Sequence, residues 1–548
     1  MPSRVLALTL VLVLAVPAAA RTWPEIQKDF KSRYASADPA AKAAAMALLA
    51  EGDCKAACEL LGQVVALHET ELAKVLGEID ALNVQLAPLL GRTQFFGDEL
   101  DRRNRYQAEI EAKQVVRAGH DGVLAAADAA LVAMKSDECR TWMLGALAKK
   151  PWTLQVAIAR ALGSLKAPPP AAIDGLIATL KDKEPRVVAA CIDALAAAQA
   201  AKAADAIALA LEHKTWQVRA AAVVALRTLG TTAHLGALIA RLGKEDGRLE
   251  EDLNATLVRL AGVNHRGNAA VWKAWYEANK GELAGRAPVS EADAQKLLRE
   301  TDEGGSTSIT FYGIKTKSKR IAFVIDRSDS MKTPAGEQPK EEDKPEEKPG
   351  AGVTLTGQDK PETPPVEGQP KPIPGQPTPP EQMHKALAGI TGNRKIDVAK
   401  RELIKAVAGL DAKTMFTIIW YNEGVQPWKT TLVLATNEGK DLAIAEIAKL
   451  DHQGATNIFD AVEQAFALAG FGKRDDNYAT GVDTIFLLSD GAPNKGRFTA
   501  PEDILREVGK MNAERKLTIH TIGIGPEHNE DLMRRLAEDN GGEYVARR

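Results

Sequence analysis

The stretch that decides the fold of the C-terminal half is residues 320–331, which read RIAFVIDRSDSM. Residues 321–325 form a continuous apolar run, the pattern expected of a parallel strand that is buried on both faces. Oxygen-bearing side chains follow at alternate positions, at Asp326, Ser328 and Ser330. Open α/β sheets bind ligands beyond the carboxyl ends of their strands, so this polar loop is a candidate site.

Strand-like and helix-like segments alternate around this stretch, from residue 306 to residue 548. We expect strands at 308–312, 320–325, 415–421, 483–489, 517–524 and 544–546. We expect amphipathic helices at 395–410, 442–450, 458–469, 502–512 and 530–539. This alternation predicts an α/β domain, Rossmann-like in outline, with a doubly wound, mostly parallel sheet and helices on both of its faces.

Two later segments carry further oxygen ligands to the ends of expected elements. Thr456 lies in a turn before a helix, and Asp490 directly follows a strand. With Asp326, Ser328 and Ser330 they make a set of hard oxygens, which suits Mg²⁺, or Mn²⁺ or Ca²⁺, better than zinc or copper. Only two of these groups are carboxylates, so a bound dication would keep residual positive charge. An incoming carboxylate could then complete its coordination sphere.

Three motifs now stand in order: Asp-x-Ser-x-Ser after an apolar strand, Gly-x-Thr-Asn, and Ser-Asp-Gly before Pro-Asn. This set resembles the metal-ion-dependent adhesion site of von Willebrand factor type A (VWA) domains. The resemblance implies that Ser328, Ser330 and Thr456 coordinate the metal directly or through water. It implies that Asp326 and Asp490 act mainly through water and hydrogen bonds, and that an acidic residue of a protein partner takes the last position.

Asp329 departs from the family pattern, because many members carry glycine at this position. Our interpretation is that its carboxylate points to solvent. Three alternatives stay open: Asp329 tightens metal binding, holds a secondary cation, or repels an acidic ligand.

The chain before residue 306 is predicted to be all-α. Residues 21–118 carry a coiled-coil-like seam, in which spacings of three and four alternate. Its members are Val65, His68, Leu72, Val75, Ile79, Leu82 and Leu86. Pro88 should end this helix, and a second helix should complete an antiparallel hairpin. We interpret His68 as a polar core residue and not as a ligand.

Residues 119–283 repeat a helix-pair pattern. Segments 155–162, 186–195 and 217–226 end in Ala-Leu pairs that recur after 33 and then 31 residues. The pattern resembles HEAT-like repeats, shorter than usual and rich in alanine, which stack into an α-solenoid. Trp272, Trp275 and Tyr276 are predicted to cap this solenoid, with an aromatic ligand platform as the alternative. Residues 284–305 are predicted to be a linker.

An insertion at 333–392 interrupts the C-terminal domain. Residues 334–380 hold 13 of the chain's 28 prolines and few large apolar side chains. Such a segment cannot bury enough surface to offset its ordering entropy, so we expect disorder. It is either a tolerated loop expansion or a gate whose glutamates compete for the metal.

The first 20 residues carry the pattern of a cleaved signal peptide: a basic Arg4, an apolar core and a small-residue site at Ala18–Ala20. The apolar core is shorter than the roughly 20 residues that span a bilayer. We therefore expect export to a periplasmic or extracellular location, with no membrane span in the mature chain.

Four cysteines remain: Cys54, Cys58, Cys139 and Cys191. In an exported protein they form one or two disulfides or stay as buried thiols, and three complete pairings are possible. A zinc site is the weaker interpretation, because His68 is the only further ligand that is near in sequence.

Composition excludes several functions. A net charge of −3 over 548 residues does not predict the basic surface that nucleic-acid binding needs. The sequence contains no P-loop, no Gly-x-Ser-x-Gly motif and no Cys/His cluster. The pair His68-Glu69 lacks the second histidine of a metalloprotease motif. A lone His452 is weak evidence for a general base. We expect no enzyme.

We predict a protein-binding or adhesion protein that grips an acidic group on a protein partner through the metal. The alternative is a structural scaffold, in which the helical repeats bind partners and the metal only stabilises its loop. The partner and the oligomeric state stay open.

Overall fold

The computed structural model describes residues 21–86, 89, 96–148, 151–300, 309–335, 379–468 and 481–547. The chain divides into two compact units, Met1–Thr179 and Leu180–Arg548. The predicted signal peptide and residues 336–378 of the insertion lie outside the described residues. Among the helices of the described ranges, none is both long and apolar enough to cross a membrane.

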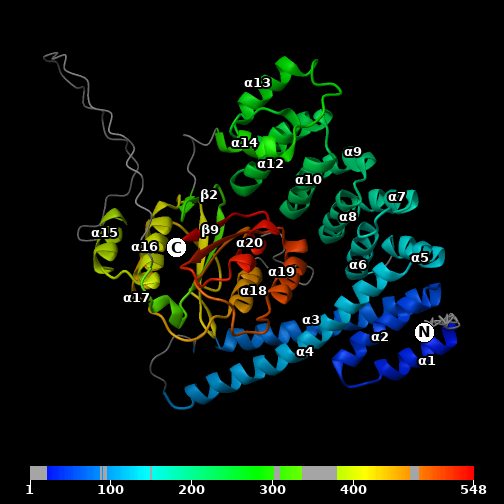
Figure 1. Cartoon of the computed structure of the whole chain (residues 1–548), viewed down its shortest axis with the longest axis horizontal. Coiled ribbons are helices and arrows are strands. Elements are labelled where there is room, and N and C mark those ends of the chain that lie inside the picture. The colour runs from blue at the N-terminus through cyan, green and yellow to red at the C-terminus, as the bar shows by residue number, and fades with distance from the viewer. Residues whose placement is uncertain are drawn as a thin grey trace, which may run out of the picture. The chain divides into compact units, whose positions relative to one another are not determined.

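The first unit consists of helices. They are α1 (Trp23–Tyr34), α2 (Pro39–Gly52), α3 (Lys55–Leu86), α4 (Glu99–Ala133), α5 (Asp137–Leu147), α6 (Trp152–Gly163) and α7 (Pro170–Thr179). The long helices α3 and α4 pack side by side (Figure 1). All seven seam positions of α3 are buried, which confirms the predicted seam, and α3 ends two residues before Pro88. Helix α4 continues through residue 118, where we placed the boundary of the repeats.

The histidine on the seam lies in a small polar cluster. The Tyr34 hydroxyl lies 2.8 Å from His68 Nε2, and His68 Nδ1 lies 2.9 Å from His120 Nδ1. Burial lowers the pKa of His68 to about 4, with a smaller contribution from His120, so the ring is neutral at neutral pH. His68 is therefore a polar core residue, as the sequence indicated.

The helical part of the second unit continues the repeat pattern. Its elements are α8 (Pro185–Ala197), η2 (Ala201–Ala203), α9 (Ala204–Leu209), η3 (Ala210–Glu212), α10 (Trp216–Leu229), η4 (Thr232–His234), α11 (Leu235–Leu242), α12 (Gly247–Ala261), α13 (Ala269–Asn279) and α14 (Glu291–Glu300). Small buried alanines such as Ala189, Ala221 and Ala222 let α8 and α10 approach closely.

Helix α13 packs as a cap would. The Trp272 side chain is fully buried, and its Nε1 donates to Asn254 Oδ1 of α12 at 2.9 Å. Trp272 is thus a packing residue and not an exposed platform. Helix α14 lies inside the segment predicted as a linker, and the Val289 amide just before it donates to Arg259 O of α12 at 3.0 Å. This half of the predicted linker is therefore helical.

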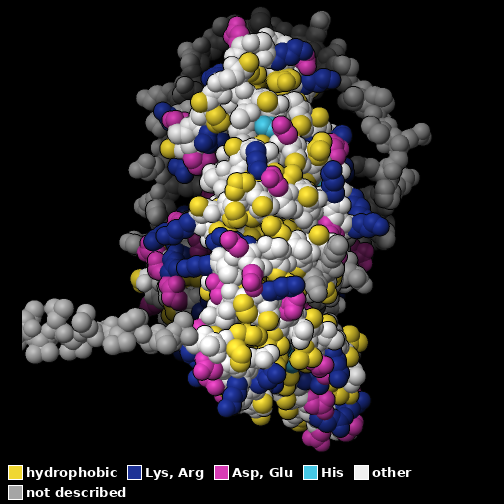
Figure 2. Space-filling view, turned by 90° about the vertical axis from the view of Figure 1, so that its right-hand side faces the viewer, with side chains coloured by type: hydrophobic (Ala, Val, Ile, Leu, Met, Phe, Trp, Pro, Cys, Tyr) yellow, Lys and Arg dark blue, Asp and Glu magenta, His cyan; other side chains and the backbone are white. Residues whose placement is uncertain are grey.

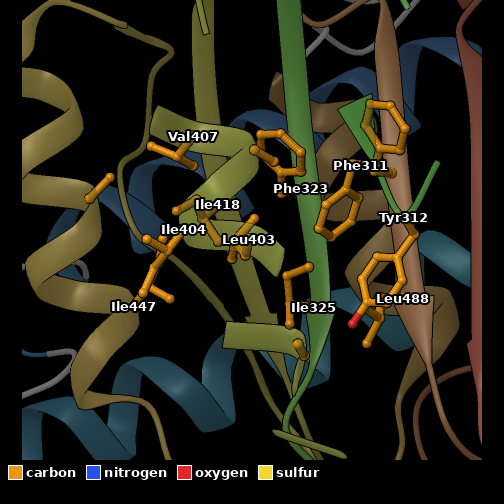
Figure 3. Close-up of a cluster of buried hydrophobic side chains, with 14 of the residues drawn as sticks. Phe311, Tyr312, Phe323, Ile325, Leu403, Ile404, Val407, Ile418, Ile447 and Leu488 are labelled. Atoms are coloured by element: carbon orange, nitrogen blue, oxygen red, sulfur yellow. The ribbon is translucent and has the colours of Figure 1, made fainter. Parts of the chain in front are cut away.

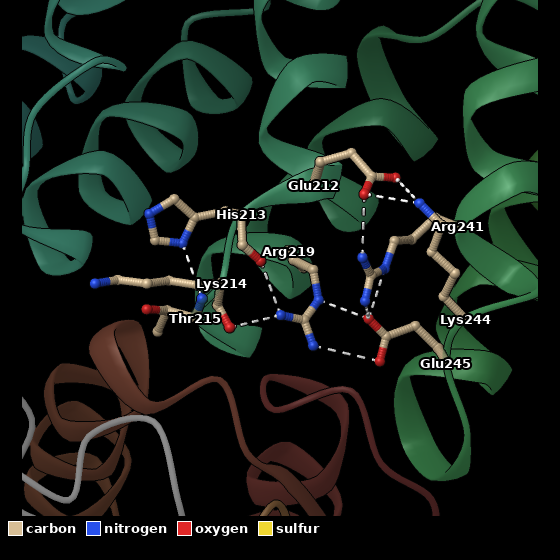
Figure 4. Close-up of polar contacts among 8 residues, drawn as sticks. All are labelled: Glu212, His213, Lys214, Thr215, Arg219, Arg241, Lys244 and Glu245. Atoms are coloured by element: carbon tan, nitrogen blue, oxygen red, sulfur yellow. Dashed lines mark hydrogen bonds and ion pairs between the residues drawn. The ribbon is translucent and has the colours of Figure 1, made fainter.

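Ion pairs join the loops between these helices (Figure 4). Glu245 accepts from Arg219 Nε at 2.6 Å and from Arg241 Nε at 2.7 Å, and Glu212 pairs with Lys244 at 2.9 Å. Three cations, Arg219, Arg241 and Lys244, thus share the two carboxylates of Glu212 and Glu245. Figure 2 shows one face of the molecule, on which acidic, basic and apolar side chains are interspersed; on that face no wide basic surface is visible.

The second unit also contains the predicted sheet, ordered β5-β4-β3-β7-β8-β9. Its parallel strands are β3 (Arg320–Asp326), β4 (Met415–Tyr421), β7 (Thr484–Ser489), β8 (Thr518–Ile524) and β9 (Tyr544–Arg547). Two short strands, β5 (Val425–Pro427) and β6 (Val433–Leu434), pair antiparallel with β4. A separate hairpin joins β1 (Ile309–Phe311) to β2 (Ile314–Thr316). The mostly parallel sheet is confirmed; β2, β5 and β6 were missed because two or three residues show no period.

Helices cover both faces of this sheet. On one face lie α15 (Pro379–Gly389), α16 (Lys395–Gly409) and α17 (Asn437–Lys449), and on the other α18 (Ile458–Leu468), α19 (Pro501–Arg515) and α20 (Glu530–Glu538) (Figure 1). Phe323 and Ile325 of β3 point toward α16 and α17, where Leu403, Ile404 and Ile447 meet them (Figure 3). The alternation of α and β thus gives the doubly wound architecture.

Helix α15 corrects the expected disorder of 333–392. Residues 379–389 are helical, and Met383, Ala386 and Leu387 are partly buried against the core cluster, where α15 packs on α16 and α17. These apolar side chains follow the last proline at helical spacing, so this end of the insertion buries enough surface to fold. Disorder stays a prediction for 336–378.

Candidate metal centre

The carboxyl ends of three neighbouring strands meet at one edge of the sheet. Asp326, the last residue of β3, is paired in register with Tyr421, the last residue of β4. On the other side, Ile325 pairs with Leu488 of β7, two residues before Asp490. Because these strands are parallel, the loops that follow them lie side by side.

A chain of hydrogen bonds joins the first motif to Asp490. The Ser328 amide donates to Asp326 Oδ1 at 2.8 Å, and the hydroxyls of Ser328 and Ser330 lie 2.9 Å apart. Ser330 Oγ donates to Asp490 Oδ1 at 2.7 Å, across 160 residues of sequence. The two motifs therefore form one polar cluster.

The remaining predicted ligand, Thr456, reaches the same place. A methyl group added at Gly491 would lie 3.6 Å from Thr456 Oγ1 and 3.7 Å from Ser330 Oγ, so both hydroxyls face this glycine. The Thr456 amide donates to Asn494 Oδ1 at 2.8 Å, and the Asn494 amide donates back to Thr456 O at 3.0 Å. Thus the fold brings all five predicted residues together, and their role as metal ligands stays a prediction.

The two carboxylates are fully buried, with 0% of Asp326 and of Asp490 exposed. Burial, with a smaller contribution from the nearby Asp490 carboxylate, raises the pKa of Asp326 to about 6. Two anions at this depth are costly unless protons or cations offset them. This edge of the sheet therefore has the electrostatics of a cation site.

Sequence reasoning missed one cation here. Lys395 Nζ donates to Asp490 Oδ2 at 3.0 Å and to Glu527 Oε2 at 2.7 Å, and only 2% of the lysine is exposed. Burial alone lowers the pKa of Lys395, but the contacts with Glu527 and Asp490 outweigh it and raise the pKa overall. Nothing in the sequence indicated this contact, because 95 residues separate Lys395 from Asp490.

Ser489 was also missed as a supporting residue, although it stands in the quoted Ser-Asp-Gly motif. Its hydroxyl donates to Asp326 Oδ2 at 2.8 Å, so both carboxylate oxygens of Asp326 accept a hydrogen bond. A carboxylate held in this way has a fixed orientation, as ligands supported from a second layer do.

The side of the site around Asp329 is more exposed to solvent than the two buried carboxylates. The Asp329 side chain is 61% exposed, as interpreted from the sequence, with Oδ1 3.4 Å from His452 Nδ1. The Asp329 amide donates to Gly454 O at 2.8 Å, which joins the first loop to the loop of Thr456. The Ser330 residue is half-buried, so a ligand can approach the cluster from this side.

The two ends of the insertion are paired beside the site. The Ala335 amide donates to Asn393 O at 2.8 Å, and the Lys395 amide donates to Thr333 O at 2.9 Å. Thr333 in turn follows the metal loop by three residues. The insertion was predicted to be either a tolerated loop expansion or a gate whose glutamates compete for the metal. Both hypotheses concern residues outside the described ranges and stay open.

The donor set fits a hard dication. Within the described residues, no group of three or more His, Cys, Asp and Glu side chains gathers as a metal site; this centre has two carboxylates and three hydroxyls. The hydroxyls of Ser328 and Ser330 lie 2.9 Å apart, and Ser330 Oγ lies 2.7 Å from Asp490 Oδ1, so these hard oxygens would be near enough to one another to hold one such ion together.

Comparison with protein families identifies two parts of the chain. The von Willebrand factor type A domain family matches residues 391–546, which include Thr456 and Asp490. The Asp326 motif lies before that match, on the far side of the insertion. HEAT repeats match residues 140–227 and 173–256.

Two relatives illustrate the extent of the similarity. Human inter-alpha-trypsin inhibitor heavy chain H4 is 31% identical over 162 residues, 29% of this chain and 17% of that protein. Human von Willebrand factor A domain-containing protein 3A is 28% identical over 131 residues, 24% of this chain and 10% of that protein. The chain thus spans less than a fifth of the length of either relative.

Solved structures are more distant. Proximal thread matrix protein 1 from the mussel byssus, with a zinc-occupied MIDAS motif, has 16% identity and a TM-score of 0.22, covering 41% of each chain. An aerotolerance-related membrane protein from Bacteroides fragilis has 13% identity and a TM-score of 0.24, covering 41% of this chain and 90% of that one. From the family matches and the fold, the chain carries a C-terminal von Willebrand factor type A domain preceded by HEAT repeats.

Proposed function

We propose that this protein is an exported, non-enzymatic binding protein. Its VWA domain holds Mg²⁺, or Mn²⁺ or Ca²⁺, through Asp326, Ser328, Ser330, Thr456 and Asp490. Through that ion it binds an acidic group on a protein partner. VWA and HEAT domains are typically non-catalytic, and VWA domains with an adhesion site bind divalent metal.

The observation that carries this proposal is the convergence of two buried carboxylates and three hydroxyls at one sheet edge. Ser330 lies 2.7 Å from Asp490 and 2.9 Å from Ser328, which supports a shared role for these oxygens in holding one ion. Side chains that hydrogen bonds hold close together lose little conformational entropy when they bind.

The charge balance explains why an acidic partner is favoured. Lys395 already offsets part of the charge of Asp490, so the carboxylates do not fully neutralise a dication. A metal with uncompensated positive charge attracts a carboxylate, and the half-buried Ser330 leaves a side from which one can approach.

Metal binding is tested first, by isothermal titration of Mg²⁺ and Mn²⁺ into the chelator-treated full chain. We expect saturable uptake of one ion, and uptake weakened about tenfold in Thr456→Ala. The matched control is Thr431→Ala, which removes an exposed threonine hydroxyl of the same domain. Absence of saturable uptake by the wild-type chain would overturn the proposal.

Partner binding is tested separately, by capture from the exported fraction with and without chelator. Asp326→Ala should lose capture while circular dichroism shows a folded chain. Captured proteins should be released by chelator and by free carboxylates such as acetate at high concentration. Capture that survives both Asp326→Ala and chelator contradicts a metal-mediated contact.

A second candidate is the scaffold, in which the helical repeats bind the partner. The observation that favours it is exposed apolar surface: Leu209 of α9 is 78% exposed and Val224 of α10 is 55% exposed. Leu209→Ser and Val224→Ser should abolish capture if this candidate is right, and leave it unchanged if the metal centre binds the partner.

A further inference from the structure

The start of helix α5 is tied to the start of helix α3 in the first unit. Asp53, just before α3, accepts hydrogen bonds from the amides of Lys135 at 2.8 Å and Ser136 at 3.0 Å. In return, Glu138 of α5 accepts from the Lys55 amide at 3.2 Å. These bonds cross more than 80 residues of sequence and fix the two helix ends against each other.

Each of these helix ends carries a cysteine in its first turn, and the two thiols meet. Cys58 Sγ lies 2.6 Å from Cys139 Sγ and 3.4 Å from Met134 Sδ. Both cysteines are 0% exposed. The sulfur–sulfur distance is longer than the bonded value of about 2.05 Å, so the two cysteines are unbonded thiols here, but it is too short for comfortable contact between two thiols. A small approach of the two sulfurs is enough to form the bond.

We propose that Cys58 and Cys139 form a disulfide that links α3 to α5. The other cysteines are placed differently: Cys54 is half-buried one turn before Cys58, and Cys191 is fully buried in the other unit. The geometry therefore selects a single disulfide, Cys58–Cys139, and leaves Cys54 and Cys191 as thiols.

The chemistry is a dithiol oxidation by thiol–disulfide exchange. A disulfide oxidant, such as oxidised glutathione or a thiol oxidase, is attacked by one cysteine thiolate. The second thiolate then displaces the reduced oxidant, so that one S–S bond forms here and one S–S bond breaks there, and the two protons of the cysteines end on the two sulfurs of the reduced oxidant. Burial raises the pKa of both thiols, so the exchange belongs to folding, before α5 covers Cys58.

The test is peptide mapping of the full chain after refolding with oxidised and reduced glutathione. The chain is unfolded, alkylated without reductant and cleaved after lysine and arginine. Because Lys55 separates Cys54 from Cys58, every pairing gives different peptides. We expect peptide 56–74 joined to peptide 136–140, with Cys54 in peptide 43–55 and Cys191 in peptide 187–202 both alkylated.

Two results would overturn the proposal. One is alkylation of all four cysteines before reduction. The other is a dominant link between peptides 43–55 and 136–140, which is the pairing Cys54–Cys139.

A stability measurement adds a second readout. Reduction should lower the midpoint of thermal unfolding by several degrees, because the bond closes a loop of 81 residues. The double variant Cys54→Ala/Cys191→Ala should keep that reductant-dependent shift, whereas Cys58→Ser should lose it. A shift of the same size in Cys58→Ser would also contradict the assignment.

Discussion

The helical hairpin of α3 and α4 and the candidate metal centre at the carboxyl ends of the strands, here called the rim of the sheet, both bury ionisable side chains. They do so in opposite ways. In the hairpin, His68 meets His120 and Tyr34, and burial keeps its ring neutral. At the rim, Asp326 and Asp490 are buried beside hydroxyls and one lysine. The hairpin cluster is satisfied by its own hydrogen bonds, whereas among the described residues Lys395 is the cation that pairs with Asp490, and it also pairs with Glu527. Such an imbalance of charge favours the binding of a further cation.

The largest expected effect comes from removing the cation of the rim. Lys395→Met leaves Asp490 buried without its partner, so the metal-free chain should lose about 3 kcal/mol of stability. Saturating Mg²⁺ should restore most of that loss, because the dication then offsets the carboxylate. Thermal unfolding with and without Mg²⁺ measures both.

The matched control for that variant is Lys405→Met, which removes an exposed ammonium from the same helix, α16. It should change stability by less than about 0.5 kcal/mol. Equal losses in the two variants would show that the pair Lys395–Asp490 contributes little, and that the rim resembles the hairpin more than we infer.

The next effect concerns the metal itself. Asp490→Asn keeps the shape of the side chain but removes one of two charges, so Mg²⁺ affinity should fall by roughly 100-fold. Titration calorimetry on the folded variant is the measurement. Asp503→Asn, which changes an exposed carboxylate of α19, should bind Mg²⁺ as the wild type does. Unchanged affinity in Asp490→Asn would remove Asp490 from the ligand set.

The hairpin should respond to pH instead. The folded-state pKa of His68 lies near 4, below the unfolded value of 6.5, so the unfolded chain binds a proton first. The contribution of the neutral ring is fully present above pH 6.5 and is lost as the pH falls from 6.5 toward 4. The loss should reach about 3 kcal/mol by pH 4.

Hydrogen exchange of α3 amides, corrected for the intrinsic rate at each pH, reports this loss locally. His68→Phe should flatten the pH dependence, and His384→Gln, at an exposed histidine, should not. A pH dependence that persists in His68→Phe would assign the effect to other groups near the ring, such as His120, Glu71 or Lys42.

The smallest effect is expected at Asp329. Its carboxylate is 61% exposed, so water screens its field at the metal. Asp329→Asn should weaken Mg²⁺ affinity by no more than about threefold, and added salt should abolish the difference. A larger, salt-independent change would make Asp329 part of a cation site, which is one of the alternatives that its sequence position left open.

Much of the sheet domain followed from local pattern. The apolar run before Asp326 predicted β3, and the order of strands and helices predicted the parallel sheet. The repeats were visible as recurring Ala-Leu pairs. The short strands β2, β5 and β6 were not predictable, and neither was α15, because a proline-rich flank hid its few apolar residues.

By itself, the sequence determined which residues are the candidates for metal binding: the oxygens of Asp326, Ser328, Ser330, Thr456 and Asp490 stand in three recognisable motifs. Tertiary structure alone decided what surrounds them. The contact of Lys395 with Asp490 and the meeting of Cys58 with Cys139 join residues 95 and 81 positions apart. Patterns in the sequence predict the structure of a single helix, strand or turn. Contacts between residues far apart in the sequence depend on how whole helices and strands pack together.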